Sequence, residues 1–146
     1  MVETVQYIHL APETSPSATI SERPFSAVIA TTVDITSDWR HLVSEWLIKE
    51  GCRCTMAWGR DGSLWDDSVD IAHLEAFDWG DIPDDQMVMT TWHDDETLSE
   101  VLEYAKNSVF HPIESEINHL IILDISNEPR ENYLIDLFNK ACDYDD

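Results

Sequence analysis

The sequence predicts a single α/β domain: a three-layer structure with a mostly parallel, four-stranded sheet and helices on both of its faces. Short apolar segments rich in β-branched residues recur along the chain, as expected for strands that are buried on both sides. A longer segment follows each of them, with apolar residues at every third or fourth position, the spacing of one helical face. Strands and helices that alternate in this way form parallel sheets with crossover helices. The length of 146 residues suits one such domain.

The first 24 residues stand apart from this pattern. Residues 5–10 alternate loosely between apolar and polar side chains, which favours a strand at an edge of the sheet. Residues 11–24 contain three prolines among serines and threonines, a composition typical of a flexible connector. We therefore divide the chain into an N-terminal segment, residues 1–24, and a single α/β domain, residues 25–146.

The α/β domain begins with two predicted strand–helix units, whose strands are residues 25–33 and 52–58. Residues 36–38 (Thr-Ser-Asp) suit the N-terminus of the first helix, and Gly51 stands where a glycine commonly follows a helix. Ser63 is expected to cap the second helix. The apolar positions are Trp39, Leu42, Val43, Trp46 and Leu47 in the first helix and Trp65, Val69 and Ala72 in the second.

Residues 86–105 predict a third strand, a polar elbow and a third helix in immediate succession, after a loop over residues 77–85. Thr97 and Glu100 match the capping box that starts such a helix. Residues 111–112 (His-Pro) are expected to end it, because a residue before proline disfavours helical backbone. The elbow contains His93, Asp94, Asp95 and Glu96.

A fourth strand is predicted over residues 119–123. Asn127 is expected to cap the last helix, with Pro129 in its first turn, and the tail at 143–146 is expected to fray. We expect the spatial order 2-1-3-4 for the four strands, with the N-terminal segment at an edge. This order places a ligand site between the first and third strands, where the order reverses. The residues expected there are Asp34 to Asp38 and Thr91 to Asp94, flanked by residues 58–60 and 124–126.

The charge of the chain narrows the range of its partners. The chain contains thirty Asp and Glu residues and eight Lys and Arg residues, which gives a net charge of −22. Such a chain repels nucleic acids and anionic membranes, so we expect basic proteins, cations or no partner. The acidic surface could also serve solubility alone. The sequence has no secretory signal and no apolar run near the roughly 20 residues that span a bilayer, which indicates a cytoplasmic protein. Cys52, Cys54 and Cys142 are then expected to be reduced, with the first two in the core.

Two clusters of residues could carry chemistry. His93 beside Asp94 could act as a general base or a metal ligand, or the elbow acids could simply favour the start of the next helix. Asp66, Asp70 and His73 share one helical face and could hold Mg²⁺, or they could form a solvated acidic surface. No glycine-rich phosphate loop follows a predicted strand, and we expect no cofactor.

The distribution of charge is a stronger signal than either cluster. No Lys or Arg stands between Arg60 and Lys106, whereas Asp and Glu recur throughout this interval. Charge of one sign over such a length indicates an extended negative surface, and tryptophans along it are typical anchors of protein interfaces. The residues expected to bind a partner are Trp58, Asp66, Asp67, Asp70, Trp79, Trp92, His93, Asp94, Asp95 and Glu96.

At Trp58-Gly59, at residues 65–70 (WDDSVD) and at residues 90–96 (TTWHDDE), the chain resembles an uncharacterised family of small acidic bacterial proteins. The resemblance covers roughly residues 26–125. It implies a bacterial source and a shared α/β domain, and it implies no catalytic role for any residue.

Taken together, these features favour a non-enzymatic interaction protein that binds a basic protein partner. A toxin-immunity protein or an antitoxin fits best, because complementary charge speeds association with a nuclease toxin. One alternative is a DNA mimic, which requires carboxylates in rows like those of phosphates. The other is a metal-dependent enzyme, which requires His93 with Asp94, or Asp66 with Asp70, to converge in a cleft.

Overall fold

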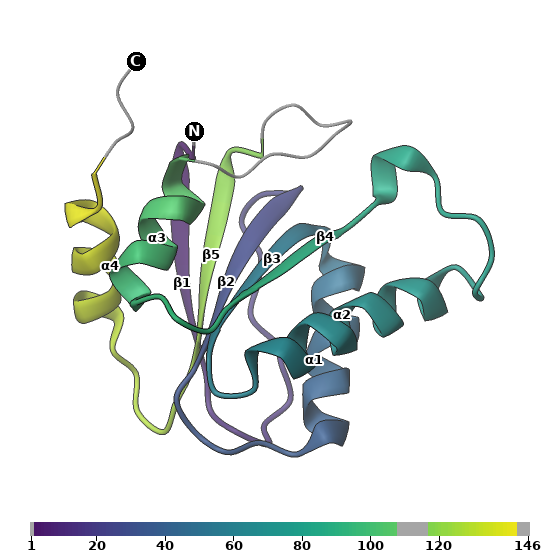
Figure 1. The fold of residues 1–146 in the computed structure, drawn as a ribbon, viewed down its shortest axis with the longest axis horizontal. Helices are drawn as coiled ribbons and strands as arrows, with labels where there is room; N and C mark the ends of the chain where they lie inside the picture. The colour runs from purple at the N-terminus through teal and green to yellow at the C-terminus, as the bar shows by residue number, and fades with distance from the viewer. Residues whose placement is uncertain (1, 108–116, 143–146) are drawn as a thin grey trace.

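The computed structural model describes residues 2–107 and 117–142. Its centre is one sheet of five parallel strands in the spatial order β1-β5-β2-β3-β4 (Figure 1). The expected end of the third helix at residues 111–112 and the tail at 143–146 lie outside the described residues. The strands are β1 (Thr4–Leu10), β2 (Phe25–Thr31), β3 (Cys52–Gly59), β4 (Met89–His93) and β5 (His119–Ile125).

Helices cover both faces of this sheet, which confirms the predicted α/β class and its three layers. α1 (Ser37–Glu50) and α2 (Gly62–Ala76) lie on one face, and α3 (Leu98–Asn107) and α4 (Glu131–Lys140) lie on the other (Figure 1). A single 3₁₀ turn, η1 (Asp84–Gln86), precedes β4. None of the described helices combines the length and apolar character needed to cross a membrane. The two cores are built around Phe25, Ala27, Ile29, Ile121 and Leu123 under α1 and α2, and around Val28, Ala30, Leu120 and Ile122 under α3 and α4.

The predicted number and order of the strands are wrong. The N-terminal segment contributes a full strand, β1, which lies at the expected edge and pairs with β5 along its length. The expected fourth strand, β5, lies between β1 and β2 because all seven of its residues are buried and need a neighbour on each side. β4 has no buried residue and is the other edge. Residues 11–24 contain no helix or strand, although Ile20 is buried in the core.

Three of the predicted capping signals are confirmed. The Thr36 hydroxyl accepts a hydrogen bond from the Trp39 N–H at 3.2 Å and starts α1. Gly51 ends it with a φ of 103°, a left-handed conformation that favours glycine. Thr97 and Glu100 form the reciprocal bonds of a capping box at 3.1 Å.

Two helix starts differ from the prediction. α2 begins after Asp61, which adopts a left-handed φ of 58°, and neither Asp61 nor the expected Ser63 provides a side-chain cap. Aspartate tolerates this backbone better than most residues, so the helix can begin two residues earlier than expected. α4 begins after Arg130, which places both Asn127 and Pro129 before the helix.

The observed strand order also changes the position at which a ligand site is expected, because the chain reverses its direction across the sheet at a different pair of strands. β2 leads to α1 on one face and β5 leads to α4 on the other, so the connections diverge between β2 and β5. β3 lies between β2 and β4, so the expected site joining Asp34–Asp38 to Thr91–Asp94 is wrong. Asp34 instead pairs with Arg60 at 2.7 Å.

Candidate functional site

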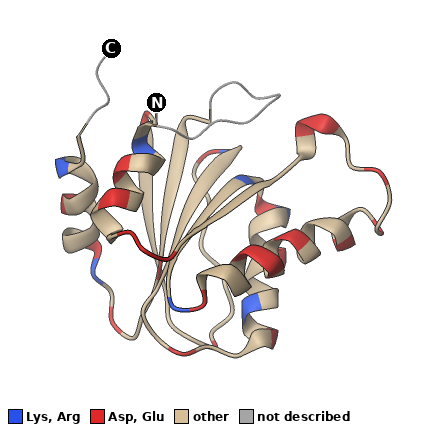
Figure 2. Cartoon of the chain, in the orientation of Figure 1, with Lys and Arg blue, Asp and Glu red and all other residues tan. Residues whose placement is uncertain are grey.

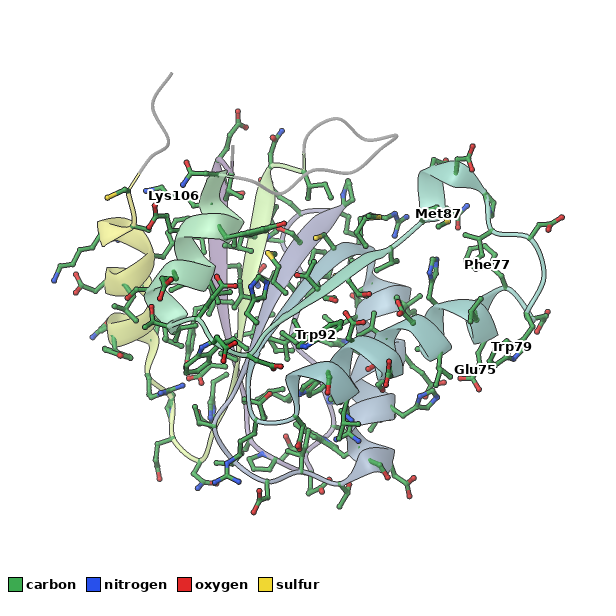
Figure 3. The ribbon with its side chains drawn as sticks, in the orientation of Figure 1. Glu75, Phe77, Trp79, Met87, Trp92 and Lys106 are labelled. Carbon is green, nitrogen blue, oxygen red and sulfur yellow. The ribbon has the colours of Figure 1, made fainter. Side chains whose placement is uncertain are left out.

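Trp92 stands on the outer strand of the sheet, beside the start of α2. Side chains alternate between the two faces of a strand, and Trp92 faces α2. A Cβ placed on Gly62 would lie 3.5 Å from the Cβ of Trp92. Trp92, which is labelled in Figure 3, is 49% exposed. Its Nε1 donates to Oδ2 of Asp94 at 3.3 Å. Trp92 and Asp94 therefore form an exposed rim along the edge of the sheet.

His93 faces the other side of the sheet. Its ring lies 5.4 Å from the ring of Tyr104 on α3, and its side chain is only 8% exposed. Nδ1 lies 2.8 Å from Oε1 of Glu96, and Nε2 lies 3.0 Å from the Thr91 hydroxyl. The structure thus divides the elbow, with His93 and Glu96 against α3 and Asp94 on the α2 side.

Asp66, Asp70 and His73 share one face of α2, as predicted, and this face lies against β4 and the segment before it. The Thr90 hydroxyl donates to Oδ1 of Asp70 at 3.0 Å, and Nε2 of His73 lies 2.8 Å from the carbonyl oxygen of Gln86. Asp66 is buried, and its Oδ1 has no hydrogen-bond partner within the described ranges. The structure thus brings Asp66 and Asp70 together beside Thr90. His73 instead contacts Gln86, in the segment before β4.

Neutralising Asp66 is expected to stabilise the protein. Burial raises the pKa of Asp66 despite the Thr90 hydroxyl, and the charges of Asp70 and Asp67 raise it further. A raised pKa means that the folded protein favours the protonated carboxyl over the carboxylate. The resulting contribution to stability is complete below the unfolded pKa of about 3.9 and is lost as the pH rises through the folded pKa. Asp66→Asn should therefore raise the Tm at pH 7 by about 2–4 °C, and the gain should vanish near pH 4. Melting curves by circular dichroism between these pH values measure the difference.

Asp67→Asn is the matched control, because it removes the same charge from the next position, where the side chain is exposed. Its Tm should change less than that of Asp66→Asn, which separates the effect of burial from that of net charge. A lower Tm for Asp66→Asn than for the wild type at pH 7 would show that the fold needs the ionised carboxylate.

The four tryptophans expected along the acidic interval lie in different environments. Trp65 is fully buried, as expected, and its Nε1 donates to the Thr31 hydroxyl at 3.0 Å. Trp58 is half-buried and donates to the carbonyl oxygen of Glu96 at 2.9 Å. Trp79 is 63% exposed, beyond the C-terminal end of α2 (Figure 3). Trp79 and Trp92 are therefore the tryptophans of this set that a partner can reach.

Exposed carboxylates gather along α2 and the elbow (Figure 2). Because no Lys or Arg stands between Arg60 and Lys106, all the charged Asp, Glu, Lys and Arg side chains that this interval contributes to the surface are acidic. We call this part of the surface the α2–β4 face, and it consists of Asp67, Asp70, Trp92, Asp94 and Asp95.

A hollow of about 590 Å³ opens at the opposite end of the sheet, where β3 begins. Lys49 and Arg53 are among the residues that line it, together with the C-terminal ends of α1 and α2. His41 and Glu45 of α1 meet Glu75 of α2 beside this hollow. Sequence reasoning missed this group because its members come from two helices, and the four-residue spacing of His41 and Glu45 was its sequence signal.

Two of the three cysteine thiols lie in the core. Cys52 and Cys54 are buried, as predicted, and Cys142 is exposed. Burial raises the pKa of Cys54 to about 12 and also raises that of Cys52. Both thiols therefore stay protonated and unreactive at neutral pH.

Comparison with known proteins identifies the family. Neither the search of curated proteins nor the search of solved structures returned a match. One family model, described as Domain of unknown function (DUF7684), matches residues 5–141, which extends from β1 to the end of α4. This confirms the expected resemblance to an uncharacterised family and widens the part of the chain that it covers. The chain belongs to the DUF7684 family, described as a domain of unknown function.

Proposed function

We propose that the protein is a non-enzymatic interaction protein that binds a basic protein partner through the α2–β4 face, in the manner of a toxin-immunity protein or an antitoxin. The observation that carries the proposal is an edge strand, β4, that has β3 as its one neighbour among the described strands and bears an exposed tryptophan within an interval free of Lys and Arg. Each of these three properties favours one part of the binding reaction.

The open edge favours an extended segment of the partner. β4 pairs with β3 on one side, and its other side is an edge of the sheet. Backbone N–H and C=O groups on such an edge can pair with a strand from another chain. Trp92 and Met89, which are 49% and 41% exposed on opposite faces of β4, can pack against side chains on the two faces of that strand.

The acidic residues favour a basic partner. Asp67, Asp70, Asp94 and Asp95 surround the edge, in a chain with a net charge of −22. Charges of one sign accelerate the approach of a partner of opposite sign and repel nucleic acids. The hydrogen bond from Trp92 to Asp94 restricts the rotation of the indole in the free protein. The side chain therefore loses less conformational entropy when the partner binds.

The test begins by capturing partners with the full chain and then measures association with the captured protein, using tryptophan fluorescence at increasing NaCl. We expect a basic protein whose association rate falls steeply with salt. Asp94→Lys combined with Asp95→Lys should slow association at low salt by about tenfold or more. Trp92→Ala should weaken binding by about 30-fold, mainly through faster dissociation, as for an interface anchor.

The matched control places the same two charge reversals on α4, as Glu131→Lys combined with Asp136→Lys. Both residues are exposed, and α4 lies on the other face of the sheet. Equal effects of the two pairs, or an association rate that does not depend on salt, would contradict the proposal. A captured partner that releases DNA when the complex forms would identify a DNA mimic instead.

A further inference from the structure

We propose that His41, Glu45 and Glu75 form a binding site for a divalent transition-metal ion, Zn²⁺ in particular, that joins α1 to α2. Each residue offers one ligand atom, and the three atoms lie within 4.8 Å of one another. The site is separate from the α2–β4 face and does not depend on the function proposed for that face.

The distances suit a single small ion. Nε2 of His41 lies 2.9 Å from Oε1 of Glu75 and 3.8 Å from Oε1 of Glu45. Ligand atoms held about 2.1 Å from a tetrahedral Zn²⁺ lie about 3.4 Å from each other, between these two values. His41 and Glu45 are one helical turn apart on the same face of α1, so small side-chain rotations complete the site.

The donor atoms select the type of ion. One imidazole nitrogen and two carboxylate oxygens are ligand types that bind Zn²⁺, and three protein ligands is the number found in zinc sites that keep an open position. Ca²⁺ prefers six to eight oxygen ligands, and Mg²⁺ prefers oxygens and retains its waters. The contribution of His41 therefore favours Zn²⁺ over both of these ions.

The two helices hold the ligands in place. α1 and α2 pack against each other, and the Ser44 hydroxyl donates to the Ser68 hydroxyl at 2.9 Å across their contact. Ligands on rigid helices are positioned more accurately than ligands on loops. Without an ion, the contact of His41 with Glu75 is an ordinary contact between two partly exposed side chains, which contributes little to stability.

The surroundings leave room for the ion to enter and to bind a further ligand. The side chains of His41, Glu45 and Glu75 are 35%, 55% and 45% exposed. Glu45 and Glu75 also line the hollow of about 590 Å³. Coordination positions that the protein leaves open therefore face a space that can hold water or a small oxygen-bearing ligand.

The test is calorimetric titration of the full chain with ZnCl₂ at physiological salt. Cys142→Ser serves as the parent protein, because an exposed thiol also binds Zn²⁺. We expect saturable binding of one Zn²⁺ per chain, weakened at least about tenfold by His41→Ala and by Glu75→Gln. Nitrogen-15 NMR of the histidine rings should show that the His41 resonances shift first during the titration.

Asp38→Asn is the matched control, because it removes a charge from an exposed position on the same helix without touching the group. It should leave Zn²⁺ affinity unchanged, whereas a general attraction of cations to the acidic chain would weaken equally in Asp38→Asn and Glu75→Gln, which lose the same charge, and would not weaken in His41→Ala. The substituted side chains are all at least a third exposed, so the variants should keep the circular dichroism spectrum of the parent. The absence of saturable Zn²⁺ binding, or an affinity that His41→Ala leaves unchanged, would overturn the proposal.

Discussion

Replacing Arg130 with methionine is expected to lower the free energy of unfolding by about 3 kcal/mol. The carboxylate of Asp124, at the end of β5, is fully buried and accepts a bond from Nη2 of Arg130 at 2.7 Å. The Tyr7 hydroxyl donates to its other oxygen at 2.6 Å. Without the guanidinium, a buried negative charge loses its counterion, the most costly way to break such a pair. We expect the lower end of the usual range because the Arg130 side chain is 31% exposed, so water can replace part of the interaction.

Urea denaturation measures this change, and the chain offers a matched control. Arg23 forms the same type of pair with Glu50 at 2.6 Å, but there the arginine is 50% exposed. Arg23→Met should therefore cost less than about 1 kcal/mol, as exposed pairs do. Asp124→Asn combined with Arg130→Met should recover part of the loss, because it removes the uncompensated charge. Equal effects of Arg130→Met and Arg23→Met would contradict this account.

The strands that are buried on both faces were predictable from their composition. Residues 25–31 and 119–125 are fully buried in the structure, and both segments are apolar at even and odd positions. The helices were predictable for a similar reason, since apolar residues at Leu98, Val101 and Leu102 recur at helical spacing and are buried. These signals are local, so one sequence is enough to detect them.

The strand order depends on information that no local segment contains. The apolar run from Met87 to Met89 suggests a buried strand, yet both methionines are exposed, by 38% and 41%. A run of three apolar residues cannot distinguish a central strand from an edge strand. Residues 4–10 alternate only weakly, so their place beside β5 is decided by packing against distant residues.

The candidate site shows the same division between local and distant information. Its acidic, tryptophan-bearing character was predictable from the interval without Lys or Arg. The opposite orientations of Trp92 and His93 follow from the alternation along a strand, but the prediction placed His93 in the elbow, whereas β4 includes it. The predicted elbow therefore grouped side chains that the sheet separates.

Gly59→Ala is expected to lower the free energy of unfolding by about 3–5 kcal/mol. Gly59 has a φ of 94°, and a Cβ at this position would lie 2.1 Å from the carbonyl oxygen of Thr31. The backbone conformation alone costs a non-glycine residue about 1–3 kcal/mol. The contact costs more, because backbone cannot rotate away as a side chain can, so the ends of β2 and β3 must separate. Chemical denaturation of the variant measures the combined effect.

Gly51→Ala separates the two contributions, because Gly51 has a similar φ of 103° but its added Cβ would meet side-chain atoms of Arg23 at 3.3 Å or more. That flexible side chain can move, so we expect only the backbone cost, about 1–3 kcal/mol. Equal losses in the two variants would show that the close contact at Gly59 is relieved locally. If the strands do separate, the shift reaches the elbow, because Trp58 precedes Gly59 and donates to the carbonyl oxygen of Glu96. The elbow residues of the proposed binding face would then be displaced, so Gly59→Ala should lower the affinity for the partner more than Gly51→Ala.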